Sequence, residues 1–350
     1  MSDLSTSYLG LALRNPLVAS ASPLSEGVDR VRALADSGVG AVVMYSLFEE
    51  EVHREQLRDL MVSEAHEDAF GEALSYFPNV PPAGTGGATR YLRLLEQSAA
   101  AVEVPVVASL NGSTAGGWVG FARSMQDAGA AAIELNVYFV PGDPHTRARD
   151  VEDRHVEILQ QVREAVSVPV AVKLSPHFSS TGEMAMRLDR AGANGLVLFN
   201  RFLQPDVDPE ALAVTTGVTL STPAEARVAR TWIAILRGHV TASLAATTGV
   251  DGAADVVSYL LAGADVVMTA SALLRHGVGH AGVLLDGLED WMRRKGFATP
   301  EEFRGLLAVP VGVDQSAYER AGYVEALEKA RRTYGDLTGA SRGQPTISST

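Results

Sequence analysis

The chain has 350 residues, 46% of them hydrophobic and 20% charged, which is typical of a globular protein with one large domain or two small ones. Its formal net charge of −13 disfavours nucleic-acid and anionic-membrane partners, because both attract basic surfaces. The absence of cysteine excludes disulfides, iron–sulfur ligation and thiol catalysis within the chain.

Short apolar runs predict eight β-strands. In chain order they are about Pro16–Ala21, Ala41–Ser46, Val104–Leu110, Ala131–Tyr138, Val168–Ser175, Gly195–Asn200, Val240–Ala246 and Val266–Ala270. The runs are apolar on both faces, as strands of a parallel sheet are. Helical patterns such as Arg154–Val166 and Gly182–Ala191 lie between most of them.

One joint recurs before four of these strands. A helix ends at a small residue, a glycine follows, and the strand begins at once; the glycines are Gly38, Gly129, Gly192 and Gly263. Glycine is favoured there because the residue after a helix commonly takes the left-handed conformation. Eight alternating βα units predict a (β/α)8 TIM barrel, with an open doubly wound sheet as the alternative.

The chain is longer than a plain barrel, which needs about 250 residues. We expect the surplus in insertions at about 49–103 and 201–238, both at the C-terminal face of the strands, where barrel enzymes place lids and substrate loops. The expected organisation is one barrel domain over residues 1–335. A flexible tail, rich in Ser, Thr, Gly and Pro, is expected over 336–350.

Lys173 is the most informative residue, because it ends the apolar run Val168–Ser175. A lysine is seldom left in a buried strand without a partner. We favour contact with a ligand over the alternative, a structural ion pair inside the barrel.

Amides and hydroxyls dominate the other strand ends, which suits a small neutral or anionic ligand held by hydrogen bonds and one positive charge. These residues are Ser20, Ser22, Tyr45, Ser46, Asn111, Asn136, Tyr138, Ser175, Asn200, Thr247, Thr248, Thr269 and Ser271. The small residues after the last two strands predict a phosphate site, although tight joints without a ligand remain the alternative. The histidines lack metal-ligand spacing, so no metal site is predicted.

From about Leu9 to Phe297 the chain resembles the dihydroorotate dehydrogenases, which are FMN enzymes on a (β/α)8 barrel. The resemblance is carried by Asn15-Pro-Leu-Val-Ala-Ser-Ala21, Ser109-Leu-Asn-Gly112, Glu134-Leu-Asn136, Val172-Lys-Leu-Ser-Pro176, Gly195-Leu-Val-Leu-Phe-Asn200, Leu220-Ser-Thr-Pro223, Thr248-Gly-Val250 and Ala270-Ser-Ala-Leu273. It implies FMN as the cofactor and a small-molecule substrate.

The resemblance also implies roles for individual residues. Lys173 would lie beside the flavin ring near N1 and stabilise negative charge on the reduced ring. The implied cofactor-binding set is Ser20 and Ala21 at the ring, Asn111, Asn136 and Asn200 around the ring and substrate pocket, Thr248, Gly249, Ala270 and Ser271 at the phosphate, and also Ser46 and Ser221.

Departures from the family pattern concern mainly the substrate. The position of the family's Cys or Ser base falls on Phe139, which cannot accept a proton. The family's lysine at the end of the second strand is Tyr45 here. In the phosphate loop, a Gly-Gly has become Thr248-Gly249. We therefore expect Lys173, with Tyr138 or Tyr45 as proton donor, to carry the chemistry, and leave dihydroorotate itself open.

The leading hypothesis is an FMN-dependent oxidoreductase that transfers hydride between a CH–CH or C=C substrate and flavin N5, of the kind that serves pyrimidine biosynthesis. One alternative is a non-catalytic flavin- or ligand-binding barrel or partner subunit. A less favoured one is a Schiff-base aldolase that uses Lys173. The expected assembly is a homodimer, with a separate electron-transfer subunit as a further partner.

The sequence also bears on location. The segment Met1–Tyr8 lacks the basic start and apolar core of a signal peptide. No uninterrupted apolar stretch approaches the roughly 20 residues that cross a bilayer. We therefore expect a cytoplasmic protein.

Overall fold

The computed structural model describes residues 3–50, 87–112, 118–138, 142–201, 205–215, 217 and 219–334. These residues belong to two units, Met1–Ala308 and Val309–Thr350. The first unit contains the barrel. The second contains helix α11 (Gln315–Tyr334), and the tail expected at 336–350 lies outside the described residues.

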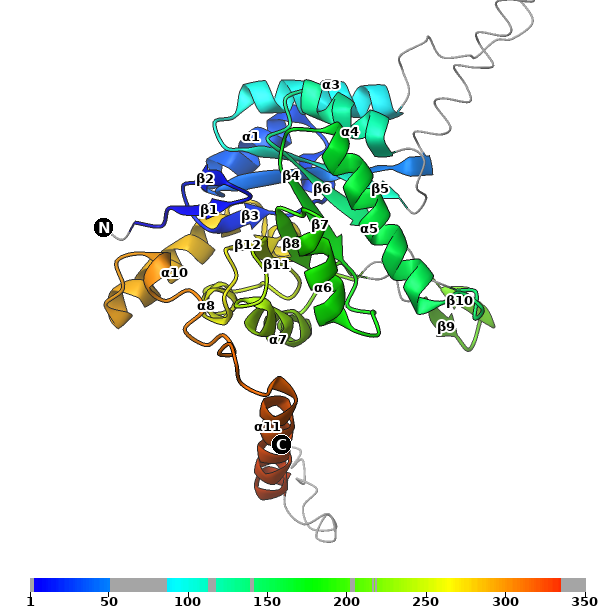
Figure 1. The fold of residues 1–350 in the computed structure, drawn as a ribbon. Helices are drawn as coiled ribbons and strands as arrows, with labels where there is room; N and C mark the ends of the chain where they lie inside the picture. The colour runs from blue at the N-terminus through cyan, green and yellow to red at the C-terminus, as the bar shows by residue number, and fades with distance from the viewer. Residues whose placement is uncertain are drawn as a thin grey trace, which may run out of the picture. The chain divides into compact units, whose positions relative to one another are not determined.

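Eight parallel strands close into the predicted barrel, in the order β11-β12-β3-β4-β5-β6-β7-β8 (Figure 1). Their bounds are β3 Leu17–Ala19, β4 Ala41–Phe48, β5 Val106–Gly112, β6 Ala132–Val137, β7 Val170–Leu174, β8 Gly195–Leu198, β11 Ser243–Ala246 and β12 Val266–Thr269. Each matches one predicted strand, with shifts of a few residues at the ends. The (β/α)8 fold class is confirmed.

Helices pack around the outside of the strands (Figure 1). They are α1 Val28–Asp36, α3 Gly87–Ala101, α4 Trp118–Asp127, α5 Ala148–Ala165, α6 Thr181–Arg190, α7 Ala226–Leu236, α8 Ala253–Ala262, α9 Ser271–His276 and α10 His280–Lys295, with 3₁₀ turns η1 Pro23–Ser25, η3 Pro223–Glu225 and η4 Pro300–Glu302. All four joint glycines, Gly38, Gly129, Gly192 and Gly263, have positive φ. The recurring joint therefore has the left-handed conformation that the sequence predicts.

The barrel interior is lined by small residues, including Ala41, Ala132, Ala171 and Ala245. The remaining space is filled by a hairpin that the sequence analysis did not predict, formed by β1 (Thr6–Tyr8) and β2 (Leu11–Leu13). Its residues Tyr8, Leu9 and Leu13 pack inside the barrel with these alanines. The hairpin thus fills the space that these small side chains leave.

The regions of the two expected insertions also contain barrel helices. Helix α3 begins at Gly87, and residues 51–86 before it lie outside the described residues. In the second region, an exposed antiparallel hairpin, β9 (Asp206–Asp208) with β10 (Ala213–Thr215), precedes helix α7. Within the described ranges, no helix has the length and hydropathy of a membrane span.

Candidate functional site

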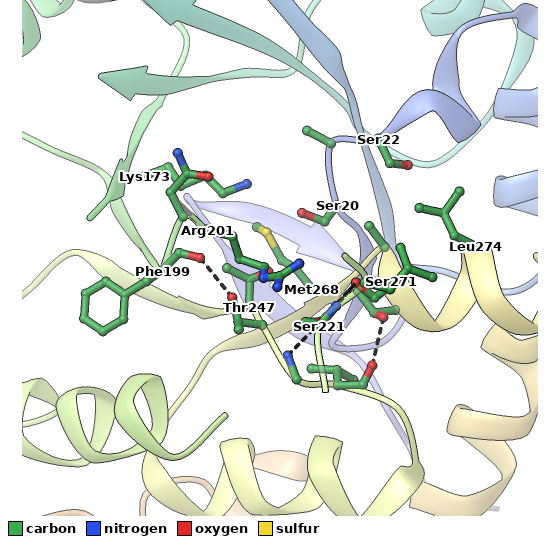
Figure 2. A pocket seen from close by; sticks show the side chains of 18 of the residues that line it. Ser20, Ser22, Lys173, Phe199, Arg201, Ser221, Thr247, Met268, Ser271 and Leu274 are labelled. Atoms are coloured by element: carbon green, nitrogen blue, oxygen red, sulfur yellow. Dashed lines mark hydrogen bonds between the residues drawn. The ribbon is translucent and has the colours of Figure 1, made fainter. Parts of the chain in front are cut away.

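A cavity of about 240 Å³ opens where β3, β7, β8, β11 and β12 end (Figure 2). The C-terminal ends of all strands meet at this face, which is where barrel enzymes place their active sites. Nine residues of the predicted catalytic and cofactor-binding set line the cavity: Ser20, Ala21, Lys173, Asn200, Ser221, Thr248, Gly249, Ala270 and Ser271. Barrel closure thus brings together residues from Ser20 to Ser271.

Two predicted asparagines meet at the rim of this group. The Asn200 side-chain amide donates a hydrogen bond to Asn136 Oδ1 at 2.8 Å. Asn111 pairs with Asn136 in the β5–β6 register, which places it at the same edge of the barrel. Asn136 and Asn111 are not among the residues that line the cavity.

The end of β4 is arranged differently from the expectation. The pairing of β4 with β5 shifts register between Val43 and Ser46, and such a bulge changes which side chains face inward. Ser46 Oγ lies 2.8 Å from Ser109 Oγ, whereas the Tyr45 ring packs edge-on against Tyr91 of α3, with centroids 5.0 Å apart. Tyr45 therefore packs in the layer between barrel and helices and does not line the cavity.

Tyr138 follows β6 directly and is half-buried; its backbone N–H donates to Gly112 O at 3.0 Å. It does not line the cavity. Phe139, at the position of the family's base, lies outside the described residues.

Lys173 combines the two roles that the sequence analysis set against each other. Its side chain lines the cavity, and its Nζ donates to Glu134 Oε1 at 3.2 Å. Both side chains are buried, with 9% of Lys173 and 1% of Glu134 exposed. Glu134 was not predicted as a site residue, although an acidic residue within a predicted buried strand carries the same signal as Lys173.

A network of hydroxyls and backbone groups shapes the opposite end of the cavity, across from Lys173 (Figure 2). Ser221 donates to Ser271 Oγ through both its backbone N–H and its hydroxyl, each at 3.0 Å. The Gly249 N–H donates to Ser221 Oγ at 3.2 Å. Gly249 has a φ of +71°, and a Cβ there would lie 2.7 Å from Thr222 O, so the loop after β11 requires glycine.

Tyr259 of α8 supports this loop from below and was not predicted. Its hydroxyl donates to Thr248 O at 2.7 Å, and Thr247 O lies at 3.2 Å. Burial raises the pKa of this phenol, so it keeps its proton and remains a donor.

Arg201 is a second cation on the cavity, also unpredicted. Its guanidinium donates to Glu225 Oε1 at 3.0 Å and to Thr219 O. Burial opposes ionisation of Glu225, but the Thr222 backbone N–H and Arg201 outweigh it, so the pKa of Glu225 is lowered. Arg201 also lines a neighbouring hollow of about 410 Å³ that includes His177 and Glu225.

The polar groups around the cavity are mainly hydrogen-bond donors and positive charges. Two cations, several hydroxyls and backbone N–H groups line it, and none of the described lining residues carries a carboxylate. This set suits an anionic ligand with several polar groups. Among the described residues no group of three His, Asp or Glu side chains is placed to hold a metal ion.

Comparison with known proteins agrees with this architecture. The sequence profile of the family described as dihydroorotate dehydrogenase matches residues 3–292. A protein of Thermoplasma acidophilum named dihydroorotate dehydrogenase B (NAD(+)), catalytic subunit, is 26% identical over 312 residues, which cover 87% of this chain and 99% of the relative. A protein of the same name from Halalkalibacterium halodurans is 35% identical over 181 residues, covering 49% of this chain and 58% of the relative.

A third relative is named differently. It is a putative dihydroorotate dehydrogenase A (fumarate) of Aeropyrum pernix, 26% identical over 222 residues, which cover 61% of this chain and 71% of the relative. The family profile spans well over half of the chain and includes every barrel strand. The chain therefore belongs to the dihydroorotate dehydrogenase family.

Proposed function

We propose that this chain is an FMN-dependent oxidoreductase that acts on a CH–CH or C=C bond of a small anionic substrate. The observation that carries the proposal is the cavity itself, with Lys173 at one end and the small-residue loops after β11 and β12 at the other. Family membership supports the same activity.

The residues present fit the cofactor. The small side chain of Ala21 would leave its backbone groups accessible to the ring, and Gly249, Ala270 and Ser271 would hold the phosphate. Among the described residues, Glu134 is the acceptor for Lys173, so other N–H donors of the ammonium remain for a ligand in the cavity. Bound FMN would supply hydride transfer at its N5 atom, as acceptor from a CH–CH bond or, when reduced, as donor to a C=C bond.

The residues near the substrate favour a proton donor over a base. Phenylalanine at position 139 cannot take a proton, and Tyr45 packs against Tyr91. Tyr138 is therefore our candidate, since a phenol hydroxyl can donate its proton to a developing carbanion but is a poor proton acceptor at neutral pH. This favours reduction of an activated C=C bond, and activity with dihydroorotate itself is the first assay to run.

We further propose a separate electron-transfer subunit. Two of the relatives described are named catalytic subunits of an NAD(+)-type enzyme. This chain has no cysteine, so an iron–sulfur carrier would need another chain. The homodimer stays a prediction that sedimentation of the purified chain would test.

The absorbance spectrum of the freshly purified protein tests the proposal directly. We expect flavin bands and release of about one FMN per chain. Lys173→Gln should lower FMN retention or its rate of reduction at least tenfold, and exposed Lys295→Gln should change neither. A colourless protein that takes up no added FMN would refute the proposed function.

A borohydride experiment decides the aldolase alternative. Trapping of a substrate carbonyl on Lys173 would support a Schiff-base enzyme. Bound FMN without trapping would end that alternative. Reduction of the bound FMN by a donor and its reoxidation by substrate would exclude the non-catalytic barrel.

A further inference from the structure

We propose that Glu134 is a positioning residue: it holds the Lys173 ammonium at the inner end of the cavity and offsets its charge. It thereby sets the redox potential of a flavin bound there. The flavin part rests on the proposed function, whereas the hold on Lys173 is a property of the chain alone.

The geometry places the carboxylate inside the barrel. On β6, Ile133 and Leu135 pack in the outer core and Ala132 packs in the inner one, so by alternation Glu134 faces inward. Lys173 on the neighbouring β7 pairs in register with Asn136. The ion pair thus bridges adjacent strands just below the cavity.

Glu134 is costly to bury and is only partly paired. Its Oε1 accepts from Lys173, but Oε2 is fully buried and has no hydrogen-bond partner among the described residues. Packing does not explain this arrangement, because an apolar residue of similar volume at such a place is commonly neutral or stabilising. A buried polar atom without a partner calls for a functional explanation.

The role of the Glu134 carboxylate follows from its contact with Lys173. The chain has only three lysines, Lys173, Lys295 and Lys329, and Lys173 alone belongs to the barrel strands. Its long side chain loses much rotamer freedom when held in one place, and a fixed acceptor offsets that loss. The ammonium is then already in position when a ligand enters the cavity.

The charge of Glu134 has a further consequence. A carboxylate 3.2 Å from the ammonium cancels part of the positive field that Lys173 directs into the cavity. A reduced flavin bound in the cavity would carry negative charge, so removal of the carboxylate charge should stabilise the reduced form. We expect Glu134→Gln to raise the ratio of reduced to oxidised FMN at a given potential by about tenfold, or about 30 mV for a two-electron couple.

The first experiment measures this shift in the FMN-loaded protein. The flavin is equilibrated with a redox dye of known potential, and wild type, Glu134→Gln and Glu152→Gln are compared. Glu152 is the matched control, because it also loses an ion pair, with Arg187 at 3.3 Å, but on the helices outside the barrel. An unchanged or lower potential in Glu134→Gln would overturn the charge role.

The second experiment needs no flavin. In a ¹⁵N-lysine-labelled full-length chain, three ammonium groups are observed by NMR, and Lys173→Gln assigns one of them. We expect the Lys173 ammonium to give a slowly exchanging signal in wild type and in Glu152→Gln. In Glu134→Leu, which removes the acceptor, that signal should be lost to exchange.

The two arms separate the two proposals. If the wild-type chain takes up no FMN, the flavin function is refuted. If the Lys173 ammonium signal is nevertheless present in wild type and lost in Glu134→Leu, Glu134 is still the residue that holds Lys173. An ammonium signal that is the same in wild type and in folded Glu134→Leu, judged by circular dichroism, would overturn the positioning role.

Discussion

At the scale of single residues, the hydroxyl of Tyr259 decides the shape of the loop after β11. It lies 2.7 Å from Thr248 O, and Thr248 and Gly249 both have positive φ. A non-glycine residue in that conformation is strained and needs support from its surroundings. The buried phenol supplies that support from the core to the proposed phosphate site.

Tyr259→Phe should therefore weaken both the fold and the site. The loss of the donor leaves the Thr248 carbonyl unsatisfied, which costs roughly 1–3 kcal/mol of unfolding free energy. We expect that loss in urea titrations, together with a several-fold weaker affinity for FMN. Tyr91→Phe is the control, since its buried hydroxyl bonds to the Ser109 backbone and should affect stability only. Equal FMN affinity in both variants would contradict the prediction.

The site shows which residues a sequence can place and which it cannot. Lys173 and Ser271 could be assigned to one cavity, because strand ends of a closed parallel barrel meet at one face. The direction of Tyr45 could not, because the register shift of β4 breaks the period-two alternation on which the assignment depends. Glu134 could have been predicted, because a carboxylate in the apolar run of β6 needs a buried partner just as Lys173 does.

At the scale of elements, the hairpin β1–β2 was not predicted from the sequence. Each strand has three residues, too short for a detectable alternation, and the turn uses Leu9 with a φ of +56° where glycine would be expected. The eight barrel strands, by contrast, were evident from longer apolar runs and the glycine joints before four of them. Elements with a clear local pattern could thus be predicted from the sequence. The hairpin could not, because its position depends on packing between residues far apart in the chain.

The packing of this hairpin against the barrel predicts the effect of Gly195→Ala. A Cβ at position 195 would lie 2.4 Å from Leu9 Cδ2, so the Leu9 side chain must move within the packed interior of the barrel. We expect a loss of about 1–3 kcal/mol in unfolding free energy, as in other overpacked cores. Leu9→Ala in the same chain should restore part of it. Gly182→Ala, in helix α6 with 3.5 Å to its nearest neighbour, should be neutral or slightly stabilising.

Helix α5 introduces a pH dependence through His155. This buried imidazole packs edge-on against Phe178 at 5.2 Å, and its Nδ1 lies 2.7 Å from Val151 O. Burial lowers the pKa of His155, so the unfolded chain binds the proton more readily than the folded one. Stability should therefore fall as the pH drops below about 6.5, the ordinary histidine value.

His155→Phe tests this dependence. Urea titrations at pH 7.5, 6.5 and 5.5 should show a smaller loss of unfolding free energy in the variant than in wild type. Other groups titrate alike in both chains, so the difference reports His155. Parallel pH profiles would contradict the assignment.

At the scale of the whole molecule, the two units predict independent folding of the barrel. Residues 1–308 hold every barrel strand and every residue of the candidate site. A chain that ends at Ala308 should unfold cooperatively on heating, with a midpoint within about 4 °C of that of the full chain. A shift of that size corresponds to a change of roughly 1 kcal/mol in unfolding free energy. It should also retain FMN. Loss of cooperative unfolding would show that the barrel depends on the second unit.

A cluster of charged residues lies at the face of the barrel opposite the cavity. There Asp265, just before β12, accepts from Arg237 at 2.8 Å, from Arg304 at 3.3 Å and from the Leu244 backbone N–H at 2.8 Å. Arg304 also donates to the Thr6 hydroxyl at 2.5 Å, which ties strand β1 into the same cluster. The Asp265 carboxylate therefore links β11 and β12 to Arg304, which follows the last barrel helix, and through Arg304 to strand β1.

Asp265→Asn should separate stability from function. Arg304 is 94% buried, and Glu301 remains as its carboxylate partner at 2.7 Å when Asp265 loses its charge, so we expect a loss of about 1–3 kcal/mol in unfolding free energy. The exposed carboxylate of Asp290, paired with Arg293 and Arg294, is the control, and its replacement by Asn should change little. Folded Asp265→Asn should keep the FMN affinity of wild type, because Lys173, Gly249 and Ser271 lie at the other ends of the strands. A loss of affinity in the folded variant would mean that the two faces of the barrel are coupled.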